Sequence, residues 1–501
     1  MKPVAPLRRP EEIELKLAVL HTGSPALLEK RLARLPVLAR RKTTHQHLHN
    51  VYYDTPEQTL HHQRIALRMR HVTGEARPRW VQTLKTGGAG NSALSRRGEW
   101  ESTVAGTGLS QAALQDTPWS AIDPDGHVFQ TLAPAFVTVF DRTSWLVRKR
   151  DGSQVEVSLD MGKIAYANTS APICELELEL IAGQPQALFD VAQQIASHVA
   201  TLPLGTSKAE RGYALVQNRA HAPTLAQSPA LPPRLSIQQA AQRVLREAVG
   251  QFTSNLNTLY GSEDPEVLHQ ARIGWRRLRT ATWLFKSVHA GTALPAWHAL
   301  HPLLTFMGEL RDLDVARMET LPPWQQAYTA GDPRRTAQWQ SLEHALLQAA
   351  QFQRKALRYA LEKPSVGATL LAITQWLDGA AALDAPNAAG KRQKKHLQHW
   401  ARRRMLRLHD QLQQALADSG QPDSAHRVRL LAKRLRYGIE TLRPLLPPAA
   451  ARRWYRQAVK LQTRIGADRD RQQAAAVVAA LDVDRELMGF VRGLAATQTR
   501  S

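Results

Sequence analysis

The chain has 501 residues and carries 66 Lys and Arg against 43 Asp and Glu, a formal net charge of +23 at pH 7. Residues 231–501 hold 40 Lys and Arg against 22 Asp and Glu, whereas residues 1–230 hold 26 against 21. This length accommodates two or three domains, and the basic second half favours polyanionic partners. The single cysteine, Cys174, excludes an intrachain disulfide and fits a reducing compartment.

The beginning of the chain contains no convincing targeting signal. Basic residues at Lys2, Arg8 and Arg9 are followed by acids from Glu11 onwards, with no apolar core. No uninterrupted apolar run approaches the length of a membrane span. We therefore expect a soluble cytoplasmic protein without a membrane partner.

Two early observations concern strict alternation of charged and aliphatic residues. Residues 12–16 read EIELK, and residues 174–180 read CELELEL. In a β-strand this pattern puts the charges on one face and the aliphatic side chains on the other. Carboxylates that face one another across a sheet repel unless something positive lies between them, and a divalent metal ion would serve. A solvated edge strand would give the same alternation.

Four further stretches alternate in the same way, at residues 67–70, 80–85, 97–101 and 155–160. Six such strands favour an antiparallel barrel with an apolar outside and a charged lumen. Carboxylates bind Mg²⁺ or Mn²⁺, while Arg and Lys bind phosphate oxygens. The ligand that suits such a lumen is a metal-chelated oligophosphate.

These motifs resemble a known family. EIELK resembles the ExExK signature of the CYTH superfamily, the triphosphate tunnel metalloenzymes. Further matches follow in the family's order: YYDTP at 52–56, ALRMR at 66–70, QTLK at 82–85, RGEWE at 97–101, ELELE at 175–179 and SKAERGY at 207–213. The resemblance covers residues 8–217. It departs at Arg64, where the family often has Gly, and we expect that difference to affect a turn more than the lumen.

The resemblance implies a metal-dependent hydrolase of inorganic triphosphate, with Mg²⁺ or Mn²⁺ as cofactor. The implied metal ligands are Glu12, Glu14, Glu99, Glu101, Asp160, Glu175 and Glu177. The implied phosphate-binding residues are Lys16, Arg68, Arg70, Lys85, Arg97, Arg142 and Lys208. The implied catalytic residues are Glu12, Glu14, Lys16, Lys85 and Lys208. Because Lys208 follows Pro203 and Gly205, we expect it on a short helix capping the tunnel, the alternative being a solvated surface lysine.

Residues 218–233, rich in Ala, Pro, Gln and Ser, are typical of a linker, and helical spacing follows them. An internal repeat lies beyond. Residues 269–279 match residues 426–436, at a separation of 157 residues, and 308–312 match 466–470, at a separation of 158. Duplication predicts two related helical bundles about a pseudo-two-fold axis. The predicted architecture is α+β and multidomain: a tunnel domain over 8–217, a linker over 218–233 and an all-α duplicated domain over 234–498.

Each copy of the repeat places one histidine and three bases on one stripe of a helix, since they recur at i, i+3, i+7 and i+10. The stripes consist of His269, Arg272, Arg276 and Arg279, and of His426, Arg429, Lys433 and Arg436. If the pseudo-axis joins them, they line a groove that suits a run of phosphates. The alternative is two solvated faces of amphipathic helices.

The repeated segments resemble the CHAD domains, helical modules that commonly follow CYTH domains. The resemblance covers residues 235–495 and implies binding of inorganic polyphosphate, with an association with polyphosphate granules in the cytoplasm. A phosphate contact or a packing role suits the two histidines better than metal binding, because cations flank them. Arg311 and Arg469 are either phosphate contacts or members of internal ion pairs.

We therefore predict a triphosphatase tunnel joined to a polyphosphate-binding helical domain. Inorganic triphosphate and polyphosphate are the expected partners, with no specific nucleic acid; the residues leave the oligomeric state open. Three alternatives also remain open: a non-catalytic polyphosphate-binding protein, an adenylate cyclase or thiamine triphosphatase in the same tunnel, and a nucleic-acid binder favoured by charge alone.

Overall fold

The computed structural model describes residues 11–20, 23–74, 78–87, 92–232, 235–288, 294–382, 390–418 and 424–496. Residues 8–10, 233, 234, 497 and 498, at the edges of the expected domains and linker, lie outside the described residues. The chain forms two compact units, each described by itself below. Unit 1 comprises Met1–Ala222 and Glu362–Gln375, and unit 2 comprises Pro223–Leu361 and Trp376–Ser501.

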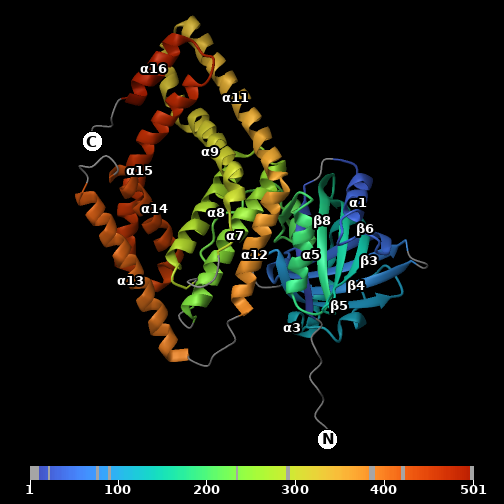
Figure 1. The fold of residues 1–501 in the computed structure, drawn as a ribbon. Helices are drawn as coiled ribbons and strands as arrows, with labels where there is room; N and C mark the ends of the chain where they lie inside the picture. Colours follow the sequence, from blue (N-terminus) through green and yellow to red (C-terminus); the bar gives the residue numbers. More distant parts are fainter. Residues whose placement is uncertain are drawn as a thin grey trace. The chain divides into compact units, whose positions relative to one another are not determined.

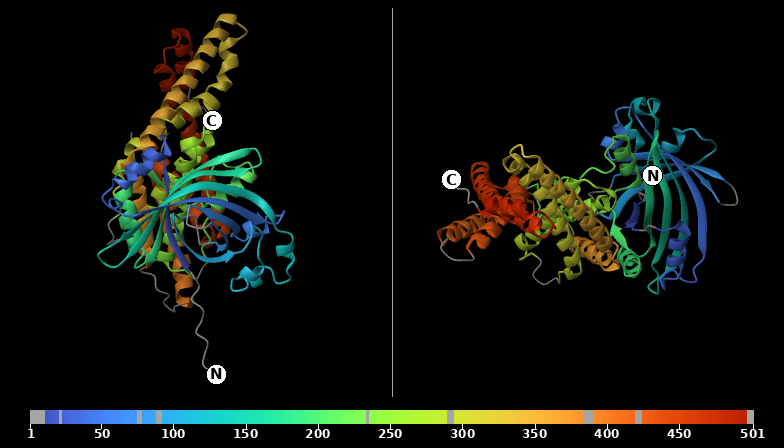
Figure 2. Two further views of the ribbon diagram at one scale, coloured as in Figure 1. Left: turned by 90° about the vertical axis from the view of Figure 1, so that its right-hand side faces the viewer. Right: turned by 90° about the horizontal axis from the view of Figure 1, so that it is seen from above.

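Unit 1 is built on an antiparallel sheet whose strands wrap around a common axis (Figures 1 and 2). Its strands are β1 (Glu11–Val19), β2 (Thr43–Asp54), β3 (Ile65–Thr73), β4 (Arg79–Thr86), β5 (Leu94–Val104), β6 (Ala133–Arg148), β7 (Gln154–Tyr166), β8 (Thr169–Ala182) and β9 (Thr201–Pro203). The order is β5-β4-β3-β2-β6-β7-β8-β1-β9, and β5 also pairs with β1. That last pairing closes eight strands into a barrel, as the alternating stretches predict.

The register of the barrel separates charged from apolar side chains. Lys16 on β1 lies opposite Glu177 on β8, and Leu15 lies opposite Leu178. Leu15 and Leu178 belong to a buried core on the outside of the sheet, together with residues of α1 (Pro25–Ala33) and α5 (Gln186–Ala196). The charged partners therefore face the lumen.

Part of the inner face is apolar and packs against α6 (Lys208–Val216). Ser207 caps this helix: its side chain accepts from the Glu210 backbone, and the Glu210 side chain accepts from the Ser207 backbone. Gly212 allows the close approach, since a Cβ there would lie 2.1 Å from the Phe136 ring. The short helix expected at Lys208 is thus present.

The remaining helical turns of unit 1 are short. They are α2 (Thr59–His62), the 3₁₀ turn η1 (Ala112–Leu114), α3 (Trp119–Ile122) and α4 (His127–Gln130). Arg64, which follows α2, has a φ of 57°, in the left-handed region that favours glycine. Arg64 also lines the lumen, so the departure from the family pattern affects both the turn and the cavity.

Unit 2 is helical. Its helices are α7 (Ile237–Gly261), α8 (Pro265–Leu284), α9 (His301–Val315), α10 (Gln325–Thr329), α11 (Pro333–Leu361), the second part of α12 (Pro364–Ala382), α13 (Gly390–Ala417), α14 (Ser424–Leu442), α15 (Pro448–Ala479) and α16 (Arg485–Ala496). Shorter turns are η2 (His298–Leu300), the π-helical η3 (Ala316–Thr320), η4 (Pro322–Trp324) and η5 (Arg443–Leu445).

The repeated motifs lie on corresponding helices of unit 2. The first stripe is on α8, which packs on α7, and the second is on α14, which packs on α13. α8 and α14 contact each other, and so do α9 and α15, which carry the second repeated motif. The two copies of the duplicated sequence therefore meet through equivalent helices.

One segment from far along the chain belongs to the core of unit 1. Leu371, in the first half of α12, is fully buried in the cluster that contains α5. Gln193 Nε2 donates a hydrogen bond to the Ala368 carbonyl at 3.1 Å, and a Cβ at Gly367 would lie 2.0 Å from the Thr201 carbonyl oxygen. No sequence signal marks this segment, which falls within the expected helical domain.

None of the described helices is long and apolar enough to cross a membrane.

Candidate functional site

The lumen of the barrel encloses a cavity of about 760 Å³ with a strongly charged wall. The predicted site residues that line it are Glu12, Glu14, Lys16, Arg68, Arg70, Lys85, Arg97, Glu99, Glu101, Arg142, Glu177 and Lys208. Asp160 and Glu175 are fully buried beside it and contact Lys208. All of the residues predicted for the tunnel thus lie in or against one cavity.

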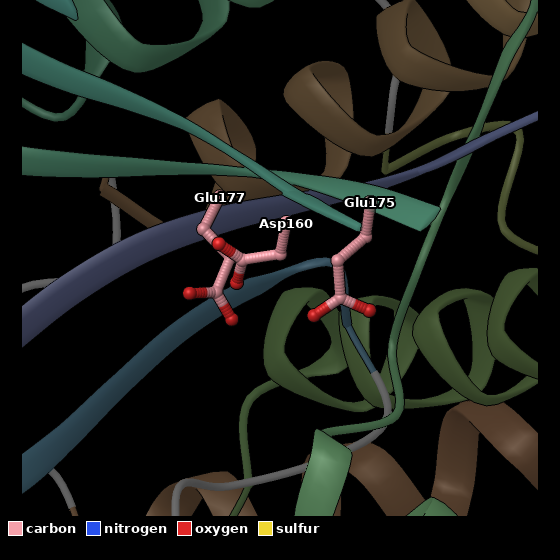
Figure 3. A group of neighbouring side chains, drawn as sticks. All are labelled: Asp160, Glu175 and Glu177. Atoms are coloured by element: carbon pink, nitrogen blue, oxygen red, sulfur yellow. The ribbon is translucent and has the colours of Figure 1, made fainter. Parts of the chain in front are cut away.

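Three carboxylates meet at one side of the lumen. Asp160 on β7 lies directly opposite Glu175 on β8, and Glu177 is two residues further along β8. Each offers an oxygen within 4.8 Å of the other two, and their side chains point to the same side of the strands (Figure 3). Such a set of hard oxygen ligands suits Mg²⁺ or Mn²⁺.

Cations hold this acidic group together. Lys208 Nζ donates to Asp160 at 2.6 Å, to Glu175 at 2.5 Å and to Glu177 at 2.9 Å. Arg142 forms a bidentate pair with Asp160 at 2.7 Å and also reaches Glu177 at 2.5 Å. Arg211, which the sequence did not single out, pairs with Glu175.

These contacts decide the charge states. Burial opposes the charge of Lys208, but attraction to the three carboxylates outweighs burial and raises its pKa. Burial would raise the pKa of Glu177, but Lys208 and Arg142 hold that pKa well below its ordinary value. Glu177 is therefore ionised and Lys208 charged at neutral pH.

A second group joins β1 to β4 and β5. Lys85 Nζ lies 3.1 Å from the Glu12 carboxylate and 2.9 Å from Glu99. Arg97 Nε lies 2.9 Å from Glu12, and its other nitrogen pairs with Glu14. Lys16 Nζ lies 2.8 Å from Glu14. The ExExK residues are therefore all engaged in this network.

The arginines of β3 are less fully neutralised. Arg68 lies 3.7 Å from Glu99 and 3.6 Å from Glu101, and Arg70 Nε donates to the neutral Asn50 at 2.9 Å. Burial, with repulsion from Arg68 and Arg142, lowers the pKa of Arg70 to about 10. Arg70 Nη1 lies 3.8 Å from Glu101, a looser ion pair than those of Arg97 or Arg142, and such a buried guanidinium favours the approach of an anion.

Two further acids of the lumen were missed. Glu156 on β7 lies opposite Glu179 on β8, and both line the cavity. Burial and the charges of Glu12 and Glu99 raise the pKa of Glu179 to about 7. The signal was present, because both residues continue the alternation of their strands.

In unit 2 the two basic stripes converge. Lys433 is surrounded by Arg272, Arg276, Arg429 and Arg469, and burial together with their repulsion lowers its pKa to about 7. Burial and repulsion from Arg276 likewise lower the pKa of Arg272 to about 10. Bases from both copies therefore form a cluster, hereafter the basic cluster, in which attraction from Asp312 and Asp470 offsets only part of the burial and repulsion.

The other stripe residues differ in their surroundings. Arg436 pairs with Glu440 at 2.9 Å, while Arg279 and His426 are exposed. His269 is partly buried, and burial with repulsion from Arg311 lowers its pKa. Arg311 is itself in an ion pair, with Glu319 at 2.8 Å.

The fold and the cavity define the class of this protein: a charged-lumen barrel joined to a duplicated helical module. Residues 10–213 match the CYTH domain family, and residues 243–479 match the CHAD domain family. The chain is therefore a CYTH domain followed by a CHAD domain.

One curated relative is similar to part of the chain. An inorganic triphosphatase of Haemophilus influenzae is 35% identical over 215 residues, which cover 41% of this chain and 55% of that protein. The match thus spans about half the length of this curated relative.

Two solved structures are also similar. The CHAD domain of the plant Ricinus communis is 28% identical, with a TM-score of 0.45, over 55% of this chain and 90% of that one. A protein of Hippeastrum, described as a putative adenylyl cyclase with a dominant triphosphatase activity, is 17% identical, with a TM-score of 0.28, over 40% of this chain and 95% of that one.

Proposed function

We propose that unit 1 is a metal-dependent hydrolase of inorganic triphosphate or a closely related linear phosphate. The observation that carries this proposal is the division of one cavity into an acidic group at Asp160, Glu175 and Glu177 and a cationic wall that includes Arg68 and Arg70. The triphosphatase relative, which is matched over the CYTH part, supports the same activity.

The residues of the lumen fit a divalent cation, because the acidic group supplies only hard oxygen ligands. A bound Mg²⁺ or Mn²⁺ would supply charge neutralisation and an activated or oriented water. Asp160, Glu175 and Glu177 would hold it, with Glu12 and Glu14 as candidates for a second position.

The chain's own residues would position the substrate and stabilise its charge, and these two effects supply most of the catalysis in phosphoryl transfer. Arg68, Arg70 and Arg97 would bind the phosphate oxygens. Lys208, at the first turn of α6, would exchange its contacts with the three carboxylates for a contact with a phosphate oxygen of the substrate. Arg68 and Lys208 are buried, so their charges act with less screening by solvent than surface charges do.

Unit 2, in this proposal, binds inorganic polyphosphate. The supporting observation is the basic cluster, in which cations from both repeats repel and so destabilise one another's charged forms. Phosphate oxygens would relieve that repulsion. Linking the cluster to the tunnel would raise the local concentration of substrate and hold the protein to polyphosphate granules in the cytoplasm.

A substrate panel tests the catalytic proposal. Tripolyphosphate, ATP, thiamine triphosphate and long-chain polyphosphate are each incubated with the full chain and Mg²⁺ or Mn²⁺, and products are identified by chromatography. We expect phosphate release from tripolyphosphate to be fastest. Faster turnover of thiamine triphosphate, or conversion of ATP to a cyclic nucleotide, would replace the proposed activity by one of the alternatives, and no turnover would leave a binding protein.

Competition tests the binding proposal. In EDTA, polyphosphate should displace labelled RNA or DNA from the full chain at much lower phosphate concentration than the reverse. Replacing Arg272, Arg276, Arg429 and Lys433 together by Gln should remove most polyphosphate affinity. The matched control replaces Arg402 and Arg403, exposed bases of α13, and should bind normally. Preferential displacement by nucleic acid would contradict the proposal.

A further inference from the structure

A histidine group lies on the outer face of the barrel, away from the lumen. Residues 45–49 of β2 read HQHLH. Asn50 and Tyr52 face the lumen with Arg70 and Arg68, their partners on β3. Because side chains alternate along a strand, His45, His47 and His49 project from the opposite face.

The neighbouring strands add further ligand-forming side chains to this face. His49 lies directly opposite His71 on β3, and His47 lies directly opposite Asp141 on β6. Directly opposed residues of antiparallel strands have Cα atoms about 4.5–5.5 Å apart, and alternate residues of one strand lie about 7 Å apart. His47, His49 and His71 therefore form a compact triangle, hereafter the histidine triangle.

Two contacts orient these rings. Asp141 Oδ1 lies 2.7 Å from His47 Nδ1, which leaves Nε2 of His47 as the ring nitrogen available to a ligand. A carboxylate that holds one ring nitrogen in this way is a common partner of metal-binding histidines. The His71 ring stacks on Trp80 with centroids 4.4 Å apart.

We propose that the histidine triangle, with Asp141 orienting His47, binds a borderline transition-metal ion, Zn²⁺ in the first instance. Imidazole suits Zn²⁺, Cu²⁺ and Ni²⁺, whereas the carboxylates of the lumen suit Mg²⁺ and Mn²⁺. The chain would thus carry two metal sites of different chemistry on the two faces of one sheet.

The triangle must close slightly to bind. Among the described residues, only Asp160, Glu175 and Glu177 already bring three ligand atoms within 4.8 Å of one another. The His47 and Asp141 side chains are 50% and 80% exposed, so the hydrogen-bonded pair can turn together toward His49 and His71. Moving χ1 between staggered wells, together with the broad χ2 of histidine, is inexpensive for such a side chain.

The test is a Zn²⁺ titration of the EDTA-stripped full chain, without a polyhistidine tag, in excess Mg²⁺ to occupy the lumen. We expect one strong Zn²⁺ equivalent in the wild type and at least about a tenfold loss of affinity in His49→Gln with His71→Gln. Asp141→Asn should weaken binding less. His127→Gln, an exposed histidine of α4, is the matched control and should bind as the wild type does.

Spectroscopy identifies the ligands. Cu²⁺ bound to the wild type should show imidazole nitrogen couplings in its electron paramagnetic resonance spectrum, and these should be lost in the double variant. If circular dichroism shows that the double variant is unfolded, the Zn²⁺ affinity of His47→Gln is measured in its place and should likewise be lower than that of the wild type. No strong Zn²⁺ site in the wild type, or equal affinity in the folded variants, would overturn the proposal.

Discussion

Lys208 shows how one side chain depends on the charges around it. Its ammonium lies between three carboxylates and is itself buried. Removing one member of a buried ionic group is costly, because the remaining charges lose their partner.

The first prediction is that Lys208→Met lowers the free energy of unfolding by about 3–5 kcal/mol in EDTA. Added Mg²⁺ should raise the melting temperature of this variant more than that of the wild type, because the cation replaces the lost charge. Thermal melts with and without Mg²⁺ measure both effects. Lys30→Met, at an exposed position of α1, is the control. Equal Mg²⁺ shifts in all three proteins would show that Lys208 and the metal do not share the acidic group.

The second prediction concerns Lys433, whose pKa of about 7 means that it is largely neutral at higher pH. Phosphate favours the charged form of Lys433, so binding of polyphosphate should be coupled to the uptake of a proton by Lys433. The affinity for polyphosphate should therefore fall as pH rises through 7. The sign for stability is opposite: repulsion destabilises the folded chain below the folded pKa and disappears as pH approaches the ordinary lysine value.

Lys433→Met should therefore weaken polyphosphate binding, flatten its pH dependence and raise the stability of the ligand-free protein, by about 1 kcal/mol after solvent screening. Binding titrations from about pH 6 to about pH 9 and urea unfolding at neutral pH supply the measurements. A variant that is destabilised, with an unchanged pH profile, would show that Lys433 packs rather than repels.

At the scale of elements, α6 is tied to the end of β2. Asp54 Oδ2 accepts from the Tyr213 hydroxyl at 2.7 Å and from the His61 backbone at 2.9 Å, and Oδ1 accepts from the backbone of Thr55 and Leu60, each at 2.8 Å. This buried carboxylate joins α2, β2 and α6. It thereby fixes the helix that presents Lys208.

The third prediction is that Tyr213→Phe lowers the free energy of unfolding by about 1.5–3 kcal/mol, the usual range for a hydrogen bond to a charged group. Turnover of tripolyphosphate should also fall, since α6 is less firmly held. Urea unfolding and steady-state kinetics are compared with Tyr166→Phe, a partly exposed tyrosine at the end of β7. Unchanged stability would mean that the Asp54 contact does not anchor α6.

The elements show what sequence can and cannot predict. Alternation along β1 and β8 predicts which face each side chain occupies, because the geometry of a strand is fixed. It does not predict that Asp160 lies opposite Glu175, since register depends on turns and on distant packing. For the same reason the Asp141–His47 contact, between residues 94 positions apart, has no local signal.

In the helical half, the spacing of the bases predicts that each stripe lies on one face of a helix. It does not predict which residues each base contacts. Arg436 and Glu440 form an ion pair at the local i, i+4 spacing, which the stripe of bases does not indicate. The convergence of Lys433 with Arg272 and Arg276 follows only from the contact of α8 with α14. Pattern therefore identifies the charged face of an element, and tertiary packing decides what that face meets.

At the scale of the whole molecule, unit 1 is not continuous in sequence. Leu371, from the helical half, is fully buried against residues of the barrel unit. A chain cut between residues 222 and 223 would therefore leave part of this core without its partner.

The fourth prediction is that Leu371→Ala lowers the stability of the CYTH unit by about 2–5 kcal/mol, as expected for a fully buried leucine. The loss should appear in the unfolding transition followed by Trp145, which lies in the same core. Leu347→Ala, at a partly exposed position of α11, should change that transition little. Equal effects of the two substitutions would contradict the assignment of residues 362–375 to unit 1.

The most direct test of the central claim compares Mg²⁺-dependent phosphate release from tripolyphosphate by the wild type and by Glu177→Gln. The variant keeps the size of the side chain but removes the negative charge of one carboxylate of the acidic group, and with it most of the affinity for a hard cation. We expect rapid release by the wild type and a loss on the order of a hundredfold or more in a variant that still folds, as judged by its melting curve. Full activity in the folded variant, with unchanged dependence on Mg²⁺, would contradict the claim that this lumen is a metal-dependent triphosphatase site.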